Sequence, residues 1–237
     1  MEIRCLGEFS FVIDGRPVRT WRAGKARSLF QYLLVNRDRF ASGNRLCEVL
    51  WPGRAVSPRS SSLKVAMHAV RKILAAHQGF TIEHENGHYR LTARDVVIDF
   101  EQLARYANTG QHQRVAELYT GDFLPGDHAD WVVEHREWCK TLVLHSLRQI
   151  STEALRDNDY SRVIEASKRM VEIDPCAEGA YQTLMIMHAR LGHLGRVHGW
   201  YRLCARRLRT ELDVQPTRLT RRILAGAMRG DLRAAAA

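Results

Sequence analysis

The sequence predicts a mainly helical protein with small β-sheets, in which an α+β module is followed by an all-α repeat module. Three observations predict it. Alternating apolar runs near the N-terminus and around an Asn-Gly dipeptide indicate strands and hairpins. The apolar positions between these runs recur with helical spacing. The second half of the chain matches itself when it is shifted by 34 residues. We expect domains at residues 1–93 and 94–225 and a flexible tail at 226–237.

The composition is that of a folded chain. Of its 237 residues, 45% are apolar and 26% are charged, which excludes a disordered polypeptide. No apolar run approaches the about 18 residues that a membrane span needs. The first residues lack the basic segment followed by an apolar segment that is typical of a secretory signal. The sequence therefore favours a cytoplasmic location and no membrane partner.

The positive charge is concentrated in the first module. The formal net charge is +10, and residues 1–93 hold 15 Lys and Arg against 7 Asp and Glu, a net charge of +8. A basic excess confined to one module is typical of a protein that binds a polyanion. The alternative is a basic surface that serves only solubility.

The first module begins with strands. Residues 5–13 alternate between apolar and polar side chains, Asp14 and Gly15 follow, and a second short run extends from Val18 to Trp21. An Asp-Gly dipeptide between such runs predicts a hairpin. A first helix is predicted next, because the apolar side chains of residues 29, 30, 33 and 34 fall on one face.

Two more helices and a second hairpin complete this module. Ser42 is a good N-cap for a second helix, which Pro52 and Gly53 end. Residues 51–59 read as a loop because of their Pro and Gly content. A third helix opens in the serine cluster 60–62 and runs to about residue 76, and residues 80–91 form a hairpin around Asn86-Gly87.

The third helix carries basic residues on its predicted outer side. Lys64, Arg71 and Lys72 lie away from the apolar arc of this helix. A basic helix fits the DNA major groove, and an adjacent hairpin reaches the neighbouring minor groove or backbone. Helix, hairpin and charge together predict binding to double-stranded DNA. The alternative for the three residues is an ordinary solvated helix face.

The second module repeats with a period of 34 residues, that of tetratricopeptide (TPR) repeats. Leu147 matches Tyr181, and Asn158, at a predicted turn, matches Gly192. The other matched pairs are Ile150 with Leu184, Tyr160 with Leu194, Val163 with Val197, and Met170 with Cys204. An earlier, poorer unit is predicted at residues 100–119. We expect Trp131, Trp138 and Trp200 in the core or between repeats.

No catalytic or metal-binding motif stands out. Residues 121–130 hold three aspartates, which we interpret as turn and helix-capping residues before Trp131 rather than a metal cluster. The five scattered cysteines have no C-x-x-C spacing and are expected as reduced thiols. The sequence lacks a phosphate-binding glycine loop, a Gly-x-Ser-x-Gly motif and a His-Glu-x-x-His motif. We therefore predict no enzyme, no cofactor and no metal.

The chain resembles the SARP transcriptional activators of actinomycetes, in which an OmpR-type winged helix-turn-helix is joined to a bacterial transcriptional activator domain (BTAD). In the first module the resemblance rests on residues 6–9 (LGEF), 24–30 (GKARSLF), 45–51 (RLCEVLW), 63–74 and 87–91 (GHYRL). In the second it rests on residues 99–100 (DF), 160–163 (YSRV), 174–175 (DP) and 212–216 (LDVQP). The order and spacing of these segments, rather than any one of them, carry the resemblance.

The resemblance implies an activator that binds direct repeats in promoters, as two copies of the chain on one site, and recruits RNA polymerase to genes of secondary-metabolite (antibiotic) biosynthesis. The chain would then lie on the nucleoid when bound. The third helix would be the recognition helix, and the loop at 51–59 would touch polymerase. The candidate DNA-binding residues are Lys25, Arg27, Arg59, Ser61, Lys64, Val65, His68, Ala69, Arg71, Lys72, His84, Asn86, Gly87 and His88. The candidate polymerase-contact residues are Trp51, Arg54, Ser57 and Arg59.

The chain departs from its relatives on the recognition helix. They tend to carry Thr at the position of Val65, an aromatic residue at Ala66 and Arg at Ala69. Valine and alanine side chains donate no hydrogen bonds to base edges. We therefore expect either that the bases are read by Ser61, Lys64, His68 and Lys72, or that direct readout is weak. The alternative function is a TPR-type protein-binding adaptor with a basic N-terminal module and no sequence-specific readout.

Overall fold

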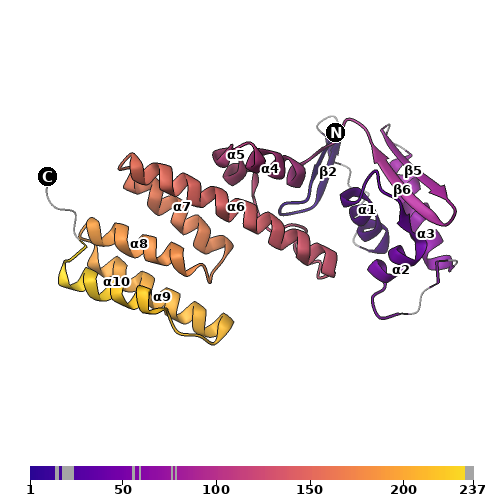
Figure 1. Cartoon of the computed structure of the whole chain (residues 1–237). Helices are drawn as coiled ribbons and strands as arrows, with labels where there is room; N and C mark the ends of the chain where they lie inside the picture. The colour runs from indigo at the N-terminus through magenta and orange to yellow at the C-terminus, as the bar shows by residue number, and fades with distance from the viewer. Residues whose placement is uncertain are drawn as a thin grey trace. The chain divides into compact units, whose positions relative to one another are not determined.

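The computed structural model describes residues 1–13, 16–17, 24–54, 57–58, 60–75, 77 and 79–232. The chain divides into two compact units. The first comprises Met1–Asp99 with Asp127–Ala129, and the second comprises Phe100–Gly126 with Asp130–Ala237. Figure 1 shows strands and short helices in the first unit and stacked helices in the second.

A four-stranded sheet opens the first unit, in the order β3-β2-β1-β7. Its strands are β1 (Glu2–Arg4), β2 (Ser10–Ile13), β3 (Arg16–Pro17) and β7 (Val97–Ile98). β1 is antiparallel to β2 and parallel to β7. β2 and β3 pair antiparallel, so the expected hairpin is present, with its second strand at residues 16–17. Its turn at 14–15 and the run at 18–21 lie outside the described residues.

The expected strand at residues 5–13 was too long. The backbone leaves the sheet after Arg4, and β2 begins only at Ser10. The carboxylate of Asp99 accepts hydrogen bonds of 2.8 Å from the backbone N–H groups of Cys5 and Leu6. Gly7 then adopts a positive φ of 82°. The two N–H groups therefore bond a buried carboxylate.

The three predicted helices and the second hairpin are present. They are α1 (Lys25–Val35), α2 (Gly43–Leu50), α3 (Ser61–Leu74), β5 (Phe80–Glu85) and β6 (His88–Ala93), and β4 (Ala41–Ser42) pairs with β6. The side chain of Ser42 accepts a hydrogen bond from the N–H of Arg45, which confirms the predicted N-cap. Side chains from all three helices form the core: Leu29, Phe30, Leu33, Leu34, Leu46, Leu50, Leu63, Met67 and Val70.

The first unit extends beyond residue 93, where we expected the boundary. β7 pairs with β1, and Asp99 bonds the segment after β1, so residues 94–99 belong to the first compact unit. α4 (Asp99–Asn108) begins directly after β7. The first and last strands of the unit therefore pair with each other in one sheet, although they lie far apart in sequence.

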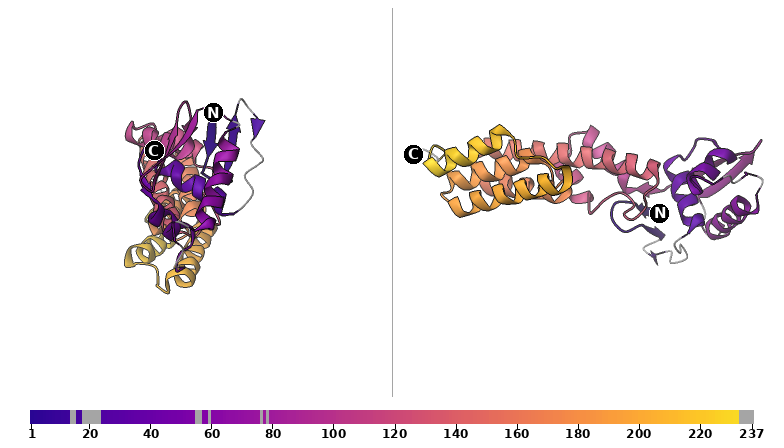
Figure 2. Two further views of the ribbon diagram at one scale, coloured as in Figure 1. Left: turned by 90° about the vertical axis from the view of Figure 1, so that its right-hand side faces the viewer. Right: turned by 90° about the horizontal axis from the view of Figure 1, so that it is seen from below.

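The second unit is a stack of helices, shown from two further sides in Figure 2. After α4 come α5 (His112–Leu118), α6 (Asp130–Arg156), α7 (Tyr160–Ile173), α8 (Glu178–Arg190), α9 (Leu194–Leu212) and α10 (Arg218–Arg229). Successive helices contact one another from α5 to α9, and α10 contacts both α8 and α9. α10 continues to Arg229, inside the segment that we expected as a tail, because Gly226 and Ala227 are buried.

The 34-residue period is also a structural period. Most of the matched apolar positions are buried in both copies, as in the pairs Val163 with Val197 and Ile150 with Leu184. The matched turn residues Asn158 and Gly192 both adopt a positive φ, of 57° and 74°. The repeated positions therefore occupy equivalent places in successive helical hairpins.

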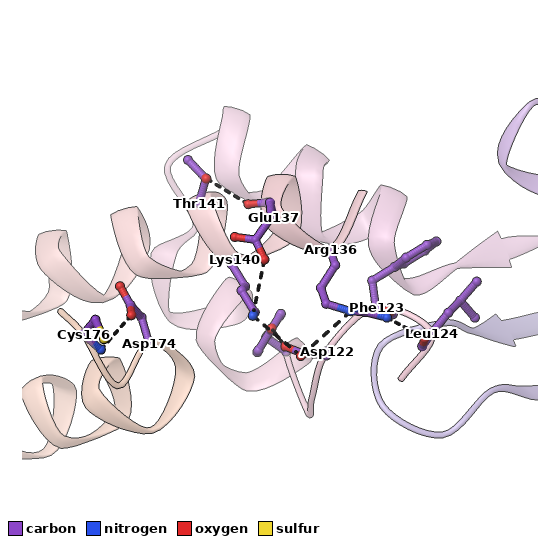
Figure 3. Close-up of polar contacts among 10 residues, drawn as sticks. Asp122, Phe123, Leu124, Arg136, Glu137, Lys140, Thr141, Asp174 and Cys176 are labelled. Carbon is purple, nitrogen blue, oxygen red and sulfur yellow. Dashed lines mark hydrogen bonds and ion pairs between the residues drawn. The ribbon is translucent and has the colours of Figure 1, made fainter. Parts of the chain in front are cut away.

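Hydrogen bonds and ion pairs to α6 hold the connection that precedes this helix (Figure 3). Asp122 lies within 4 Å of Arg136 and Lys140 of α6, and Arg136 also donates to the backbone oxygens of Phe123 and Leu124. The aspartates of this connection form internal contacts, and Asp130 is the first residue of α6.

One tryptophan does not lie where we expected it. Trp131 is buried, and Trp200 packs against a core cluster of α8, α9 and α10. Trp138 is 41% exposed, because it lies on the outer face of α6. Its size and apolar character were not enough to place it in the core.

Candidate nucleic-acid interface

The outer face of α3 is open to solvent. Its buried side chains, among them Leu63, Met67 and Val70, all face the first unit's core. On the other side Val65 is 66% exposed and Ala69 is half-buried. The expected contact residues that are fully exposed on α3 are Ser61, Lys64, Val65, His68, Arg71 and Lys72. A helix with one buried and one open face presents these side chains to a groove.

Two positions on α3 behave differently from the rest. Ala66 is buried, so it lies out of reach of a DNA groove. The guanidinium of Arg71 donates a hydrogen bond of 3.4 Å to the backbone oxygen of Ile82 in β5. That bond turns Arg71 toward the β5–β6 hairpin, which we call the wing. Lys64 and Lys72 are exposed as well, and their side chains are not tied to the wing by such a bond within the described residues.

The wing carries its turn as predicted. Asn86 and Gly87 both have positive φ values, 48° and 78°, as a tight two-residue hairpin turn requires. The ring of His84 stacks on Tyr89 with centroids 4.4 Å apart. His88 lies near the same turn, its Nδ1 3.1 Å from the backbone oxygen of Asn86. The wing tip is therefore a rigid, exposed surface of imidazole and amide groups.

A surface cavity joins the wing tip to α2 and α3. It measures about 500 Å³, and the N–H of Gly43 donates a 2.9 Å hydrogen bond to the oxygen of Gly87 beside it. It is lined by Ser42, Gly43, Asn44, Pro58, Lys64, His84, Asn86, Gly87, His88 and Tyr89. Five of the fourteen expected DNA-binding residues meet here. Asn44 was missed, although its place after the Ser42 N-cap could have revealed it.

Lys25 and Arg27 lie apart from this cavity. Both belong to the first turn of α1, where Lys25 is exposed. The guanidinium of Arg27 is half-buried and lies 4.9 Å from the ring centroid of Phe9. Arg27 is thus held partly by an aromatic contact, while Lys25 is open to solvent.

The loop after α2 carries the expected polymerase-contact residues. Trp51 is half-buried at the end of α2, and Arg54 and Ser57 are exposed. The N–H of Arg54 bonds the oxygen of Trp51, and the N–H of Ser60 bonds that of Ser57. Arg59, assigned to both sites, lies outside the described residues.

The described residues were also compared with the requirements of a metal site and of a membrane span. Within that part, no three His, Cys, Asp or Glu side chains lie close enough to hold a metal ion. The cysteines described are free thiols, and burial raises the pKa of Cys47 in α2. None of the described helices is long and apolar enough to cross a membrane.

Comparisons with known proteins agree with this architecture. The family model described as the bacterial transcriptional activator domain matches residues 99–226. Among solved structures, the chain is similar to EmbR of Mycobacterium tuberculosis, described in complex with a low-affinity phosphopeptide, at a TM-score of 0.65 and 19% identity. The match covers 96% of this chain but only 65% of the EmbR chain, and it supports the fold. The curated proteins include no match to the sequence.

Proposed function

We propose that this chain, which belongs to the bacterial transcriptional activator domain family, is a SARP-type transcriptional activator that binds direct repeats in promoter DNA. The family and the fold are those of a transcription regulator rather than of an enzyme. One observation carries the proposal. The outer face of α3 presents exposed side chains beside a wing whose tip shares a cavity with Lys64.

The side chains of α3 suggest how the DNA is read. The exposed methyl groups of Val65 suit contact with a thymine methyl group, and Ser61 and His68 offer hydrogen bonds to base edges. Lys64, in the cavity, suits a phosphate oxygen, and Asn86 and His88 are placed to support it. Phosphate contacts would set the affinity and its salt dependence.

We infer that RNA polymerase is the second partner. The exposed Arg54 and Ser57 beside Trp51 support a contact through the loop after α2, and the helical second unit supports a further protein contact. Direct repeats require two copies of the chain on one site, so we propose a homodimer on DNA. We further propose that it acts on the nucleoid in the bacterial cytoplasm, at genes of secondary-metabolite biosynthesis.

The test begins with genome-wide recovery of the bound DNA, followed by a salt titration on the best site. Lys72→Ala lowers the slope of log K against log salt by about 1 if Lys72 binds a phosphate, and relaxes base preference if it reads a base. Lys64→Ala lowers the slope in the same way. Arg94→Ala, on an exposed residue just beyond β6, is the matched control and leaves both properties unchanged.

Binding spread evenly over all DNA would contradict the proposal. It would favour the protein-binding adaptor instead, for which the second unit offers a cavity of about 480 Å³ beside α5, α6 and α7. Retention of polymerase without any DNA would support that alternative. Retention that needs an operator supports the activator.

A further inference from the structure

The net charge of the second unit changes sign along its sequence, from an acidic region to a basic one. Residues 94–189 hold 10 Lys and Arg against 16 Asp and Glu, a net charge of −6. Residues 190–237 hold 11 Arg against 3 Asp and Glu, a net charge of +8. The two parts nearly cancel, so the sum over the module hides a basic region as strong as that of residues 1–93. α9 and α10 carry most of it.

The arginines of α9 lie on its outer side. Arg202, Arg206 and Arg209 follow one another at spacings of four and three residues, which places them on one face. All three are exposed, and their face is opposite to the buried Val197 and Cys204. Within the described residues, none of their side chains forms a hydrogen bond or an ion pair.

Arg207 shows what a structural arginine looks like in this helix. It is half-buried, and its guanidinium donates hydrogen bonds of 3.1 Å to the oxygen of Val171 and 2.9 Å to the hydroxyl of Tyr181. It ties α9 to α7 and α8. The three outer arginines have no such task inside the unit.

Two glycines share the outer side of α9. Gly195 and Gly199 are exposed, and a Cβ atom at either position would meet nothing within 4 Å. Packing inside the unit therefore does not require glycine here, although each costs the helix about 1 kcal/mol relative to alanine. Gly199 borders a shallow hollow of about 450 Å³ with Arg202 and Arg206. A partner can approach the backbone of α9 closely at this point.

The basic region continues on the neighbouring helix. α10 contacts α9, as Figure 1 also shows. Arg218 and Arg222 of α10 are exposed and are spaced by one turn, on the side opposite to the buried Ala227. Among the described residues neither forms an ion pair, whereas Arg229 pairs with Asp231.

We propose that the outer face of α9, defined by Gly195, Gly199, Arg202, Arg206 and Arg209 and called here the arginine face, binds the phosphates of duplex DNA. Guanidinium groups bind phosphate oxygens bidentately. Protein–DNA interfaces are polar and strongly positive, whereas arginine at the centre of protein–protein interfaces accompanies exposed aromatic anchors such as Trp and Tyr. The residues of the arginine face are cations and glycines. Tyr201, Leu203 and Ala205 also line the hollow, but all three are half-buried, and Tyr201 packs against the core cluster of α8, α9 and α10.

The proposal rests on the proposed function in one respect. When the first unit holds an operator, the DNA that flanks it is present at a high effective concentration around the second unit. The arginine face would then add affinity without adding base preference. Three phosphate contacts correspond to about 2.7 in the slope of log K against log salt.

The test measures salt dependence on DNA without an operator. The full chain and the variant Arg202→Gln/Arg206→Gln/Arg209→Gln are titrated with a random-sequence duplex of about 40 base pairs, four helical turns. Between about 50 and 200 mM salt, the wild type loses about 40-fold more affinity than the variant, because three counterion-releasing contacts are missing. Glutamine keeps the helix propensity of α9.

The control removes the same charge elsewhere in the second unit. Arg105, Arg148 and Arg156 are exposed on α4 and α6. Their replacement by Gln leaves the slope at the wild-type value if the effect is local to α9. Equal slopes for the two triple variants and the wild type would overturn the proposal, as would equal losses in both variants.

Two further measurements distinguish a failure of this proposal from a failure of the proposed function. Unchanged DNA binding together with reduced retention of polymerase on an operator would mean that the face binds an acidic protein segment, which also overturns the proposal. The proposed function fails in a different measurement, when the wild type binds operator and random duplexes equally well.

Discussion

A buried histidine stands out at the scale of single residues. His188 of α8 is 3% exposed, and neither of its ring nitrogens has a hydrogen-bond partner among the described residues. The 34-residue period places it where the preceding repeat has Ala154. Burial lowers the pKa of His188 below its usual 6.5, and the charges of Arg196, His193 and Lys168 lower it further. The folded chain therefore holds this ring in its neutral form.

We predict that His188 makes the second unit less stable in acid. The pKa of His188 is lower in the folded than in the unfolded chain, so the unfolded chain binds more protons as pH falls below about 6.5. The free energy of unfolding then decreases by at most about 1.4 kcal/mol per pH unit. His188→Leu removes this dependence between about pH 7 and 5, as urea titrations at several pH values would measure.

The control for this prediction is His128→Asn, because His128 is exposed in the connection before α6. This variant keeps the pH dependence of the wild type. A wild-type and a His188→Leu curve that run parallel in pH would show that the buried ring does not titrate on unfolding.

Residue types alone predicted burial well only where a helical or repeat period supported them. Leu147 and Tyr181 match at 34 residues and are both buried. Trp138 has no such support, and it is 41% exposed. The unpaired side chain of His188 could not be foreseen, because the sequence does not show which neighbours surround a buried position.

The turns between helices repeat at the scale of elements. Gly110, Asn158 and Gly192 each follow a helix and have φ values of 70°, 57° and 74°. After Asn158 the N–H of Asp159 bonds the oxygen of Ala154, and after Gly192 the N–H of His193 bonds that of His188, both at 2.8 Å. These are the bonds of a helix that ends in a left-handed residue. Each helical hairpin is thus closed by the same turn.

We predict that Gly192 tolerates asparagine better than alanine. A Cβ atom at Gly192 meets nothing within 4 Å, so the cost comes from the positive φ alone. Gly192→Ala lowers the free energy of unfolding by about 1 kcal/mol or more, and Gly192→Asn lowers it less, because asparagine adopts this conformation more readily. Thermal unfolding of both variants measures the difference. Equal losses would contradict the role of φ.

Elements with local signals were predictable and long-range pairings were not. The Asn86-Gly87 turn, the Ser42 cap and the apolar arc of α3 each depend on residues close together in sequence, and all three are confirmed. β7 is two residues long and pairs with a strand 95 residues earlier. A strand of two residues is too short to show the alternating apolar pattern of a β-strand, so its pairing partner cannot be inferred from the sequence.

The whole molecule shows the same limit in its charge. A sum over each expected domain assigned the basic excess to the first module, whereas the second unit holds a basic region at α9 and α10 beside an acidic one. A net charge summed over a whole domain can thus hide a basic region that a sum over single helices detects. The candidate site on α3 was found because its residues are contiguous, and the cavity that joins Lys64 to Asn44 needed the fold.

We predict that Asp99 stabilises the first unit and leaves the second unaffected. Asp99→Ala leaves the N–H groups of Cys5 and Leu6 without their acceptor and costs about 3 kcal/mol. Hydrogen exchange is expected to quicken in β1 and β2, while the amides of α6 to α9 keep their protection. Glu2→Ala, at an exposed ion pair with Arg4, is the control and changes neither. Faster exchange throughout both units would show that they unfold together.

The parallel pairing of β1 with β7 also sets an order on synthesis. Residues 2–3 are made well before their partners, residues 97–98. The helices of the first unit and the wing can form from residues that lie close together in sequence. One edge of β1, in contrast, stays unpaired until residues 97–98 have been made. The helical repeats have no such delay, because each pairs with the hairpin made just before it. β1 is therefore among the last strands of its own unit to complete its pairing.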